Sequence, residues 1–153
     1  MGYNLHITRS EEWFEEHPQN PITIDEWYAI VATDPELVLN ERGYNVGDTE
    51  GNNSMPNKGF TDWKKHPKEE LTWFDYSEGT IYTKNPDYNT ISKMLELAGQ
   101  LNAYVLGDDC EKYQKKGNEI IVIKDDGTTS VLEYFEHNPY QYIVPKKPWW
   151  RFW

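Results

Sequence analysis

The chain has 153 residues, a length that suits one domain with its own buried core. A formal net charge of −11 excludes the phosphate neutralisation on which nucleic-acid binding depends, and it favours a basic partner. A 15% share of aromatic residues excludes a disordered acidic chain, and rings beyond the needs of a core indicate a binding surface.

The first predicted elements are a strand and an acidic loop. Apolar and polar side chains alternate over residues 2–8, which predicts a half-buried strand. Residues 10–20 are acidic and polar, and they predict a loop that holds Trp13 and Phe14.

The clearest predicted helix follows this loop. Thr23 and Glu26 have the spacing of a capping box, in which each side chain accepts from an unpaired backbone amide of the other residue. Pro35 disfavours helical geometry at Asp34, so we expect the helix to end there. Four apolar residues recur at the spacing of one helix face: Ile24, Trp27, Tyr28 and Val31.

Residues 40–70 are rich in glycine, asparagine and charge, and they show no periodicity. A stretch of this length without periodicity is either functional or mobile. Within it, Trp63 stands among Lys64, Lys65 and Lys68, which form an isolated basic spot.

A hairpin and a second helix come next. Residues 71–76 and 80–84 read as strands around a short turn with Gly79. We expect Asn85 to cap the following helix and Pro86 to occupy its first position. The helix has one apolar stripe, which consists of Tyr88, Ile91, Leu95 and Ala98.

The last predicted elements are strands and a tail. Residues 103–109 predict a short apolar strand, and residues 118–135 predict a hairpin around Asp125, Asp126 and Gly127. From residue 137 the prolines and the lack of periodicity predict an extended, aromatic-rich tail. The tail either folds back onto the domain, inserts into a partner or a second copy, or touches a membrane.

The order of elements is β-α-β-β-α-β followed by a hairpin. This order matches the ferredoxin-like split βαβ arrangement, an antiparallel sheet with two helices on one face. We therefore predict an α+β fold with a single domain over residues 1–136 and the tail over residues 137–153.

The predicted compartment is the cytoplasm. Cys110 is the single cysteine, which allows no internal disulfide and favours a reducing environment. The first residues lack the apolar run of a signal peptide, and no apolar segment approaches the roughly 20 residues of a spanning helix.

No catalytic, nucleotide-binding or zinc motif is present, so we expect neither an enzyme nor a cofactor. The histidines are His6, His17, His66 and His137, and no two have the spacing of a ligand pair. The carboxylates of the GDDCE segment could hold a hard cation, but acidic turns are common in a chain this acidic, and no metal is expected.

Four segments together resemble a known family. They are YNLHITRSEEW at 3–13, IDEWYAIVATDPEL at 24–37, TWFDYSEGTIYTKNPD at 72–87 and LNAYVLGDDCEKY at 101–113. The combination resembles a family of small, uncharacterised bacterial cytoplasmic proteins that open with a Y-x-L-H-I-T-R strand. The family brings no established activity and no catalytic residue with it. Its general character is similar to that of immunity proteins, which protect bacteria from toxins.

These observations predict a protein-binding inhibitor, an immunity protein that occupies a basic surface of a toxin. Acidic groups would speed the encounter, and aromatic anchors would slow dissociation. The candidate partner-binding residues are Glu11, Glu12, Trp13, Glu15, Glu16, Trp63, Asp108, Asp109, Glu111, Trp149, Trp150 and Trp153.

Two other hypotheses remain open. A small-ligand-binding protein or enzyme would use the WFDY hairpin and the GDD turn as pocket walls, with Asp75, Asp108 and Asp109 as its acids. A deep cleft with a carboxylate pair of raised pKa would favour this reading. Membrane contact would rest on the tail alone, and it is not expected because the acidic body opposes anionic lipid.

Overall fold

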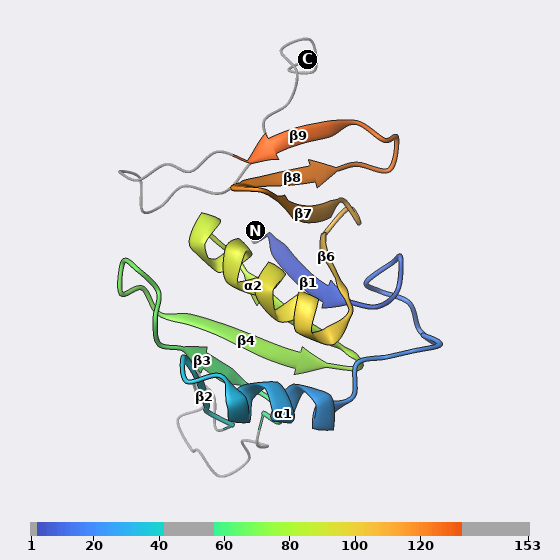
Figure 1. The fold of residues 1–153 in the computed structure, drawn as a ribbon. Helices are drawn as coiled ribbons and strands as arrows, with labels where there is room; N and C mark the ends of the chain where they lie inside the picture. Colours follow the sequence, from blue (N-terminus) through green and yellow to red (C-terminus); the bar gives the residue numbers. More distant parts are fainter. Residues whose placement is uncertain (1–2, 42–56, 133–153) are drawn as a thin grey trace.

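The structure is a computed structural model that describes residues 3–41 and 57–132 (Figure 1). These residues form two helices and nine strands, which confirms the predicted α+β class. In chain order the elements are β1 (Asn4–Thr8), α1 (Ile24–Thr33), β2 (Leu37–Leu39), β3 (Thr61–Trp63), β4 (Thr72–Ser77), β5 (Thr80–Lys84), α2 (Tyr88–Leu101), β6 (Tyr104–Gly107), β7 (Lys112–Lys116), β8 (Glu119–Ile123) and β9 (Thr129–Leu132).

All nine strands belong to one antiparallel sheet with the order β2-β3-β4-β5-β1-β6-β7-β8-β9. The predicted hairpins are present as β4–β5 and β8–β9. The sheet is larger than the predicted layout, because β2, β3 and β7 were not expected. The first two have three residues each, which is too short for periodicity to show, and β7 is mostly polar.

Helix α1 begins at the predicted capping box. The Thr23 hydroxyl accepts from the Glu26 backbone N–H at 3.1 Å, and the Glu26 carboxylate accepts from the Thr23 N–H at 3.1 Å. The helix ends at Thr33 because Asp34 is extended, as the following proline requires. Both features were predictable because they depend on residues close together in the chain.

Helix α2 is capped by Asp87, so the prediction that Asn85 caps it is wrong. The Asp87 carboxylate accepts from the Thr90 N–H at 2.8 Å. Asn85 is held instead by Tyr3, the residue before β1. Its N–H donates to the Tyr3 carbonyl oxygen at 2.6 Å, and its side-chain oxygen accepts from the Tyr3 N–H at 2.9 Å. This contact with Tyr3 leaves Asn85 and Pro86 outside the helix.

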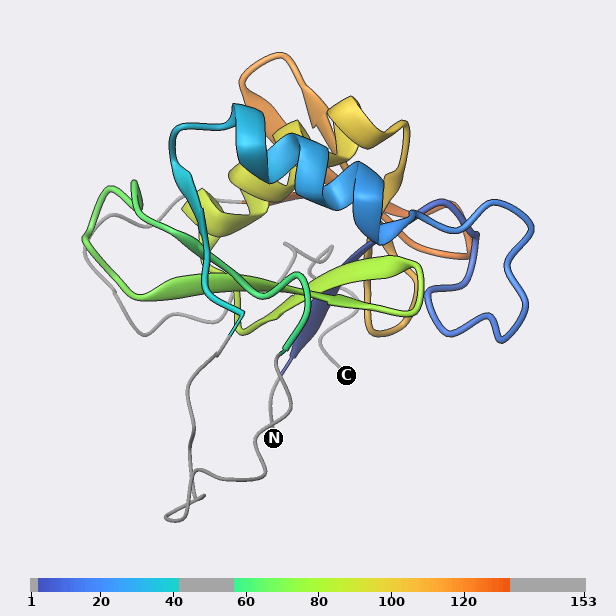
Figure 2. The same cartoon turned by 90° about the horizontal axis from the view of Figure 1, so that it is seen from below.

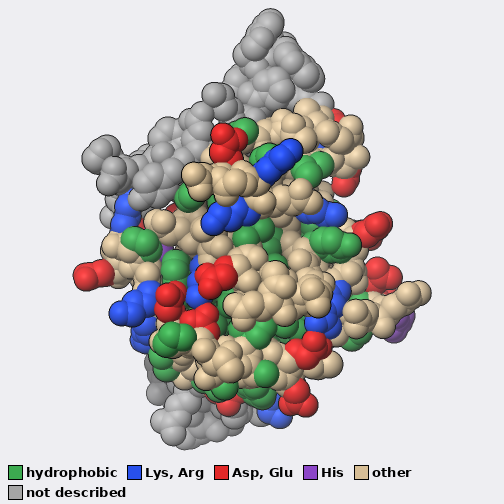
Figure 3. Space-filling view, viewed as in Figure 1, with side chains coloured by type: hydrophobic (Ala, Val, Ile, Leu, Met, Phe, Trp, Pro, Cys, Tyr) green, Lys and Arg blue, Asp and Glu red, His purple; other side chains and the backbone are tan. Residues whose placement is uncertain are grey.

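Both helices lie on one face of the sheet (Figure 2). The hydrophobic core lies between the helices and the sheet. Alternation along β1 directs Leu5 and Ile7 toward the helices and His6 toward the opposite face. Trp27 anchors α1 in this core, since its ring N–H donates to the Gly59 carbonyl oxygen at 2.8 Å. On the exposed surface of the helix side, acidic and basic side chains are interspersed (Figure 3).

A buried lysine links the two helices. Lys93 on α2 is 4% exposed, and its ammonium lies 2.7 Å from Asp34 and 3.1 Å from Glu36. Burial acts to lower the pKa of Lys93, but the hydrogen bonds to these carboxylates outweigh it and hold that pKa above its ordinary value. This ion pair network joins α2 to the segment that follows α1.

Trp63, a predicted partner-binding residue, belongs to the core, so little of its ring is open to a partner. It is 7% exposed, its ring lies against Phe74 with centroids 6.4 Å apart, and its N–H donates to Glu36 at 2.9 Å. The cause is the position of Trp63 in β3, opposite Thr72 of β4, which directs the ring toward the helices.

Candidate functional site

The acidic loop, residues 10–20, leaves the end of β1 and leads to α1 (Figure 1). Arg9 holds the start of the loop. Its guanidinium donates to both carboxylate oxygens of Glu26, at 3.0 and 2.5 Å, and to the Pro21 and Leu101 carbonyl oxygens at 3.3 and 2.9 Å. Arg9 therefore ties the start of the loop to both helices, and its hydrogen bond to Pro21 also holds the end of the loop.

Trp13 fixes the middle of the acidic loop to the sheet. Its indole stacks on the imidazole of His6, with centroids 4.1 Å apart and the ring planes within 1° of parallel. Its ring N–H donates to the Asp108 carbonyl oxygen at 3.1 Å. Trp13 was predicted to contact a partner, and in the structure its ring is held by His6 and Asp108 of the same chain.

Asp108 completes the link from the GDD turn to β1. One carboxylate oxygen accepts from the Asn4 backbone N–H at 3.0 Å, and the other lies 3.2 Å from His6 Nε2. Because a carboxylate only accepts, the His6 Nε2–H is the donor. Trp13 and Asp108, which were predicted from separate segments, are thus brought together.

The predicted acids divide into exposed and buried groups. Glu11, Glu12, Glu15 and Glu16 are exposed on the loop, and Asp109 is exposed on the GDD turn. The acidic loop contains no lysine or arginine. Together with the neighbouring Asp108, these residues form a surface rich in carboxylates, whereas the helix face carries mixed charges (Figure 3).

Glu111, a predicted partner-binding residue, is 9% exposed, so little of its carboxylate is open to a partner. Its carboxylate accepts from the Asp109 N–H at 3.2 Å. Gly107 makes room for it, since a Cβ at residue 107 would overlap the Glu111 carboxylate and the Tyr3 hydroxyl. Burial raises the pKa of Glu111, and the charges of Asp109 and Asp108 raise it further.

His6 is 4% exposed, and burial shifts its pKa in the opposite direction to that of Glu111. Burial lowers the pKa of His6 below its ordinary value, although the hydrogen bond to Asp108 opposes this change. The imidazole beneath Trp13 is therefore neutral at physiological pH, and it does not reduce the negative charge of the surface.

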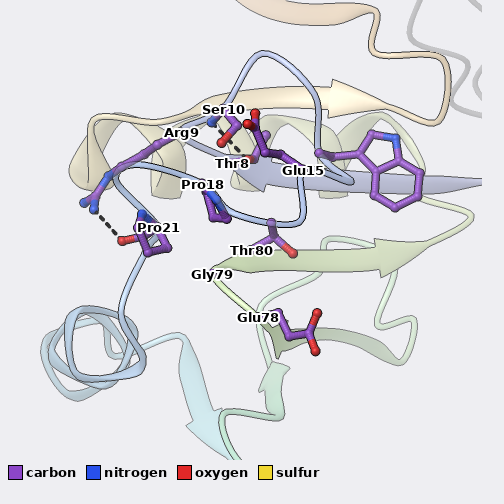
Figure 4. A pocket seen from close by; sticks show the side chains of 10 residues that line it. Thr8, Arg9, Ser10, Glu15, Pro18, Pro21, Glu78, Gly79 and Thr80 are labelled. Carbon is purple, nitrogen blue, oxygen red and sulfur yellow. Dashed lines mark hydrogen bonds between the residues drawn. The ribbon is translucent and has the colours of Figure 1, made fainter.

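A groove of about 480 Å³ lies between the acidic loop and the β4–β5 hairpin. Its lining residues are Asn4, His6, Trp13, Phe14, Glu15, Glu16, Ser77, Glu78, Thr80, Tyr82 and Lys84. A smaller cavity of about 10 Å³, enough for about one water molecule, adjoins it. Figure 4 shows this cavity, with Glu15 on the loop side and Glu78 on the hairpin turn.

The acids of the alternative enzyme hypothesis are not brought together. Asp75 is buried on β4, and its carboxylate accepts from Asn57, Tyr82 and the Tyr76 N–H at 3.2, 3.2 and 2.9 Å. Strands β5 and β1 separate it from Asp108. The lining of the groove thus holds no pair formed by Asp75 and Asp108.

A further group, not anticipated from the sequence, consists of His66, Glu70 and Asp87, whose ligand atoms lie within 4.8 Å of one another. His66 Nδ1 accepts from the Lys68 N–H at 3.0 Å, so the ring proton is on Nε2, which donates to Asp87 at 2.6 Å. A protonated nitrogen has no lone pair for a metal. The arrangement fits a structural clamp on the start of α2 better than a metal site.

Comparison with known protein families, characterised proteins and solved structures finds no match. The resemblance to the bacterial family stays a prediction. Among the described residues, no helix has the length and apolar character needed to cross a membrane. Trp149, Trp150 and Trp153, with the rest of the predicted tail, lie outside the described residues, as do residues 42–56.

Proposed function

We propose that this protein is a protein-binding inhibitor, an immunity protein that neutralises a bacterial toxin in the cytoplasm by occupying a basic surface. The observation that carries the proposal is the bond between Trp13 and Asp108, which places the acidic loop beside the GDD turn. Four exposed glutamates and Asp109 then act as one acidic surface.

The fixed position of the loop supports this function. A loop that is already ordered loses less conformational entropy when a partner binds. The stacking of Trp13 on His6 and the fork of Arg9 on Glu26 both restrict the loop before binding. An acidic surface also raises the association rate with a basic partner.

We further propose that β4, β5, β1 and β6, with the two helices, form a split βαβ unit to which the other five strands were added. The order of these four strands in the sheet supports this reading, because β1 lies between β5 and β6.

The test begins with capture of a basic partner by the tagged full chain, followed by measurement of the association rate at increasing salt. The rate should fall steeply, because charges are screened beyond about 8 Å at 0.15 M ionic strength. The Glu11→Gln/Glu12→Gln variant should associate more slowly than the parent. The control variant Asp25→Asn/Glu119→Gln removes the same two charges elsewhere and should change the rate less. Equal association rates for the two variants would refute the role of the acidic surface in partner binding.

A second candidate function is small-ligand binding, which the groove favours. Its volume of about 480 Å³ lies within the range of roughly 300–1,000 Å³ typical of ligand sites. Catalysis has less support, because Asp75 and Asp108 are separated by two strands. Binding of an uncharged metabolite in the groove, with no basic protein captured, would favour this candidate over the inhibitor.

A further inference from the structure

The groove between the acidic loop and the β4–β5 hairpin combines two kinds of side chain. Aromatic rings form one part of its lining, and they come from Trp13, Phe14 and Tyr82. Trp13 and Phe14 meet edge to face with centroids 5.3 Å apart, and the ring of Tyr82 lies 6.4 Å from that of His6. An aromatic ring attracts a cation that lies over its free face, so these rings favour a cationic ligand in the groove.

Carboxylates form the second part of the lining. Glu15 and Glu16 come from the loop, and Glu78 comes from the turn of the hairpin. Figure 4 shows Glu15 and Glu78. All three are exposed, and within residues 3–41 and 57–132 none of them forms an ion pair. Lys84 is the one lysine or arginine among the lining residues, so the three glutamates outnumber it.

The floor of the groove adds an acceptor. The side-chain oxygen of Asn4 is buried, and it has no hydrogen-bond partner in the part of the chain that the structure describes. His6 beside it is neutral because burial lowers its pKa, so it does not repel a cation. A buried carbonyl oxygen without a partner costs free energy, so a turn of the Asn4 side chain that lets this oxygen accept an N–H from a ligand would be favourable.

We propose that this groove binds an arginine side chain of the basic partner. A guanidinium is planar, so it can stack on an aromatic ring while its N–H groups donate to carboxylates at its edges. An ammonium offers no such plane, which favours arginine over lysine. This inference rests on the proposed inhibitor function, and it names the group of the partner that the protein recognises.

The direct test titrates the full chain with N-acetyl-arginine-methylamide and follows its NMR spectrum. The matched probe is N-acetyl-citrulline-methylamide, which has nearly the same shape without the charge. We expect the arginine probe to move the indole N–H resonance of Trp13 and the amides of residues 13–16 and 77–82, and the citrulline probe to move none of them. Equal shifts with both probes, or no shift with either, would overturn the proposal.

Two variants locate the binding. Glu78→Gln should weaken binding of the arginine probe by about threefold, the effect of one partly exposed charge pair. Glu119→Gln removes an exposed glutamate on β8, away from the groove, and should leave the affinity unchanged. An affinity that falls equally in both variants would show general attraction to an acidic protein and would overturn the groove as the site.

The captured partner separates this inference from the proposed function. Glu15→Gln/Glu78→Gln should raise the dissociation rate of the complex, whereas Glu11→Gln/Glu12→Gln should mainly lower the association rate. If the arginine probe binds but the first variant leaves the complex unchanged, the groove takes a small cation and the partner's side chain is rejected as its occupant. Failure to capture any basic protein would defeat the inhibitor function, and with it the partner's arginine as the occupant, whatever the probe shows.

Discussion

Trp13 and His6 stack with their ring planes within 1° of parallel, although one belongs to the acidic loop and the other to the central strand β1. The same indole donates a hydrogen bond to Asp108, which is 95 residues away in the chain. Asp108 in turn accepts from His6 and from the Asn4 backbone. The loop, the strand and the GDD turn are therefore held together by one small group of contacts.

The first prediction concerns Trp13 itself. Trp13→Ala should lower the free energy of unfolding by about 2 kcal/mol, because it removes a stacked ring and a hydrogen bond. Trp13→Phe keeps a ring over His6 and should lose less stability than Trp13→Ala. Urea denaturation measures both changes. Leu71→Ala is the control, since that side chain is 70% exposed and its loss should have little effect. A Trp13→Ala variant as stable as the parent would mean that the stacking does not hold the loop.

Local features of the fold could be predicted from the sequence. The capping box of Thr23 and Glu26 depends on residues three positions apart, and the β8–β9 hairpin depends on the turn at Asp125 to Gly127. The features that were not predicted depend on distant contacts. Asn85 does not cap α2 because Tyr3 binds it, and Trp63 is buried because β3 pairs with β4.

The candidate site was predictable in composition but not in geometry. The exposed glutamates and the GDD turn stand out in the sequence as charge. Their proximity depends on the register of β1 with β6, in which His6 lies opposite Leu106 and close to the turn at Asp108. Tyr82 and Glu78 as groove walls were missed, because the hairpin gives no sign of which loop will face it. The burial of Glu111 was not predicted, because it depends on Gly107, whose missing Cβ admits the carboxylate.

The second prediction is that His6 makes the protein less stable at acidic pH. Burial lowers the pKa of His6 in the folded state, so the unfolded chain takes up a proton first as the pH falls through about 6.5. The unfolding free energy should therefore decrease from neutral pH down to the lowered folded pKa, and then this contribution should level off. His6→Phe keeps a ring beneath Trp13 but cannot take up a proton. The difference in stability between parent and variant should depend on pH in this range, and a constant difference would contradict the assignment.

The third prediction concerns Glu111, whose contribution to stability changes with pH in the opposite direction to that of His6. Its pKa is raised by burial, so the folded state keeps a proton at pH values above about 4.5, where the unfolded chain has lost it. Stability from this group is therefore lost as the pH rises through the folded pKa. Glu111→Gln resembles the protonated form, and it should gain stability relative to the parent as the pH rises. Paired thermal melts from pH 4 to pH 7 test this, and a relative stability that falls with pH would rule it out.

The last prediction concerns the buried lysine that joins the helices. Lys93→Met should lower the unfolding free energy by about 3 kcal/mol, because the Asp34 carboxylate, on a side chain that is only 9% exposed, would lose its cation. Lys115→Met, an exposed lysine on β7, is the control and should change stability little. Adding Asp34→Asn to the Lys93 variant should restore part of the loss, since it removes the unpaired charge. Urea denaturation of the parent, Lys93→Met, Asp34→Asn and the double variant completes a double-mutant cycle around this pair. If Lys93→Met cost no more than Lys115→Met, the ion pair would contribute nothing to the contact between α2 and the end of α1.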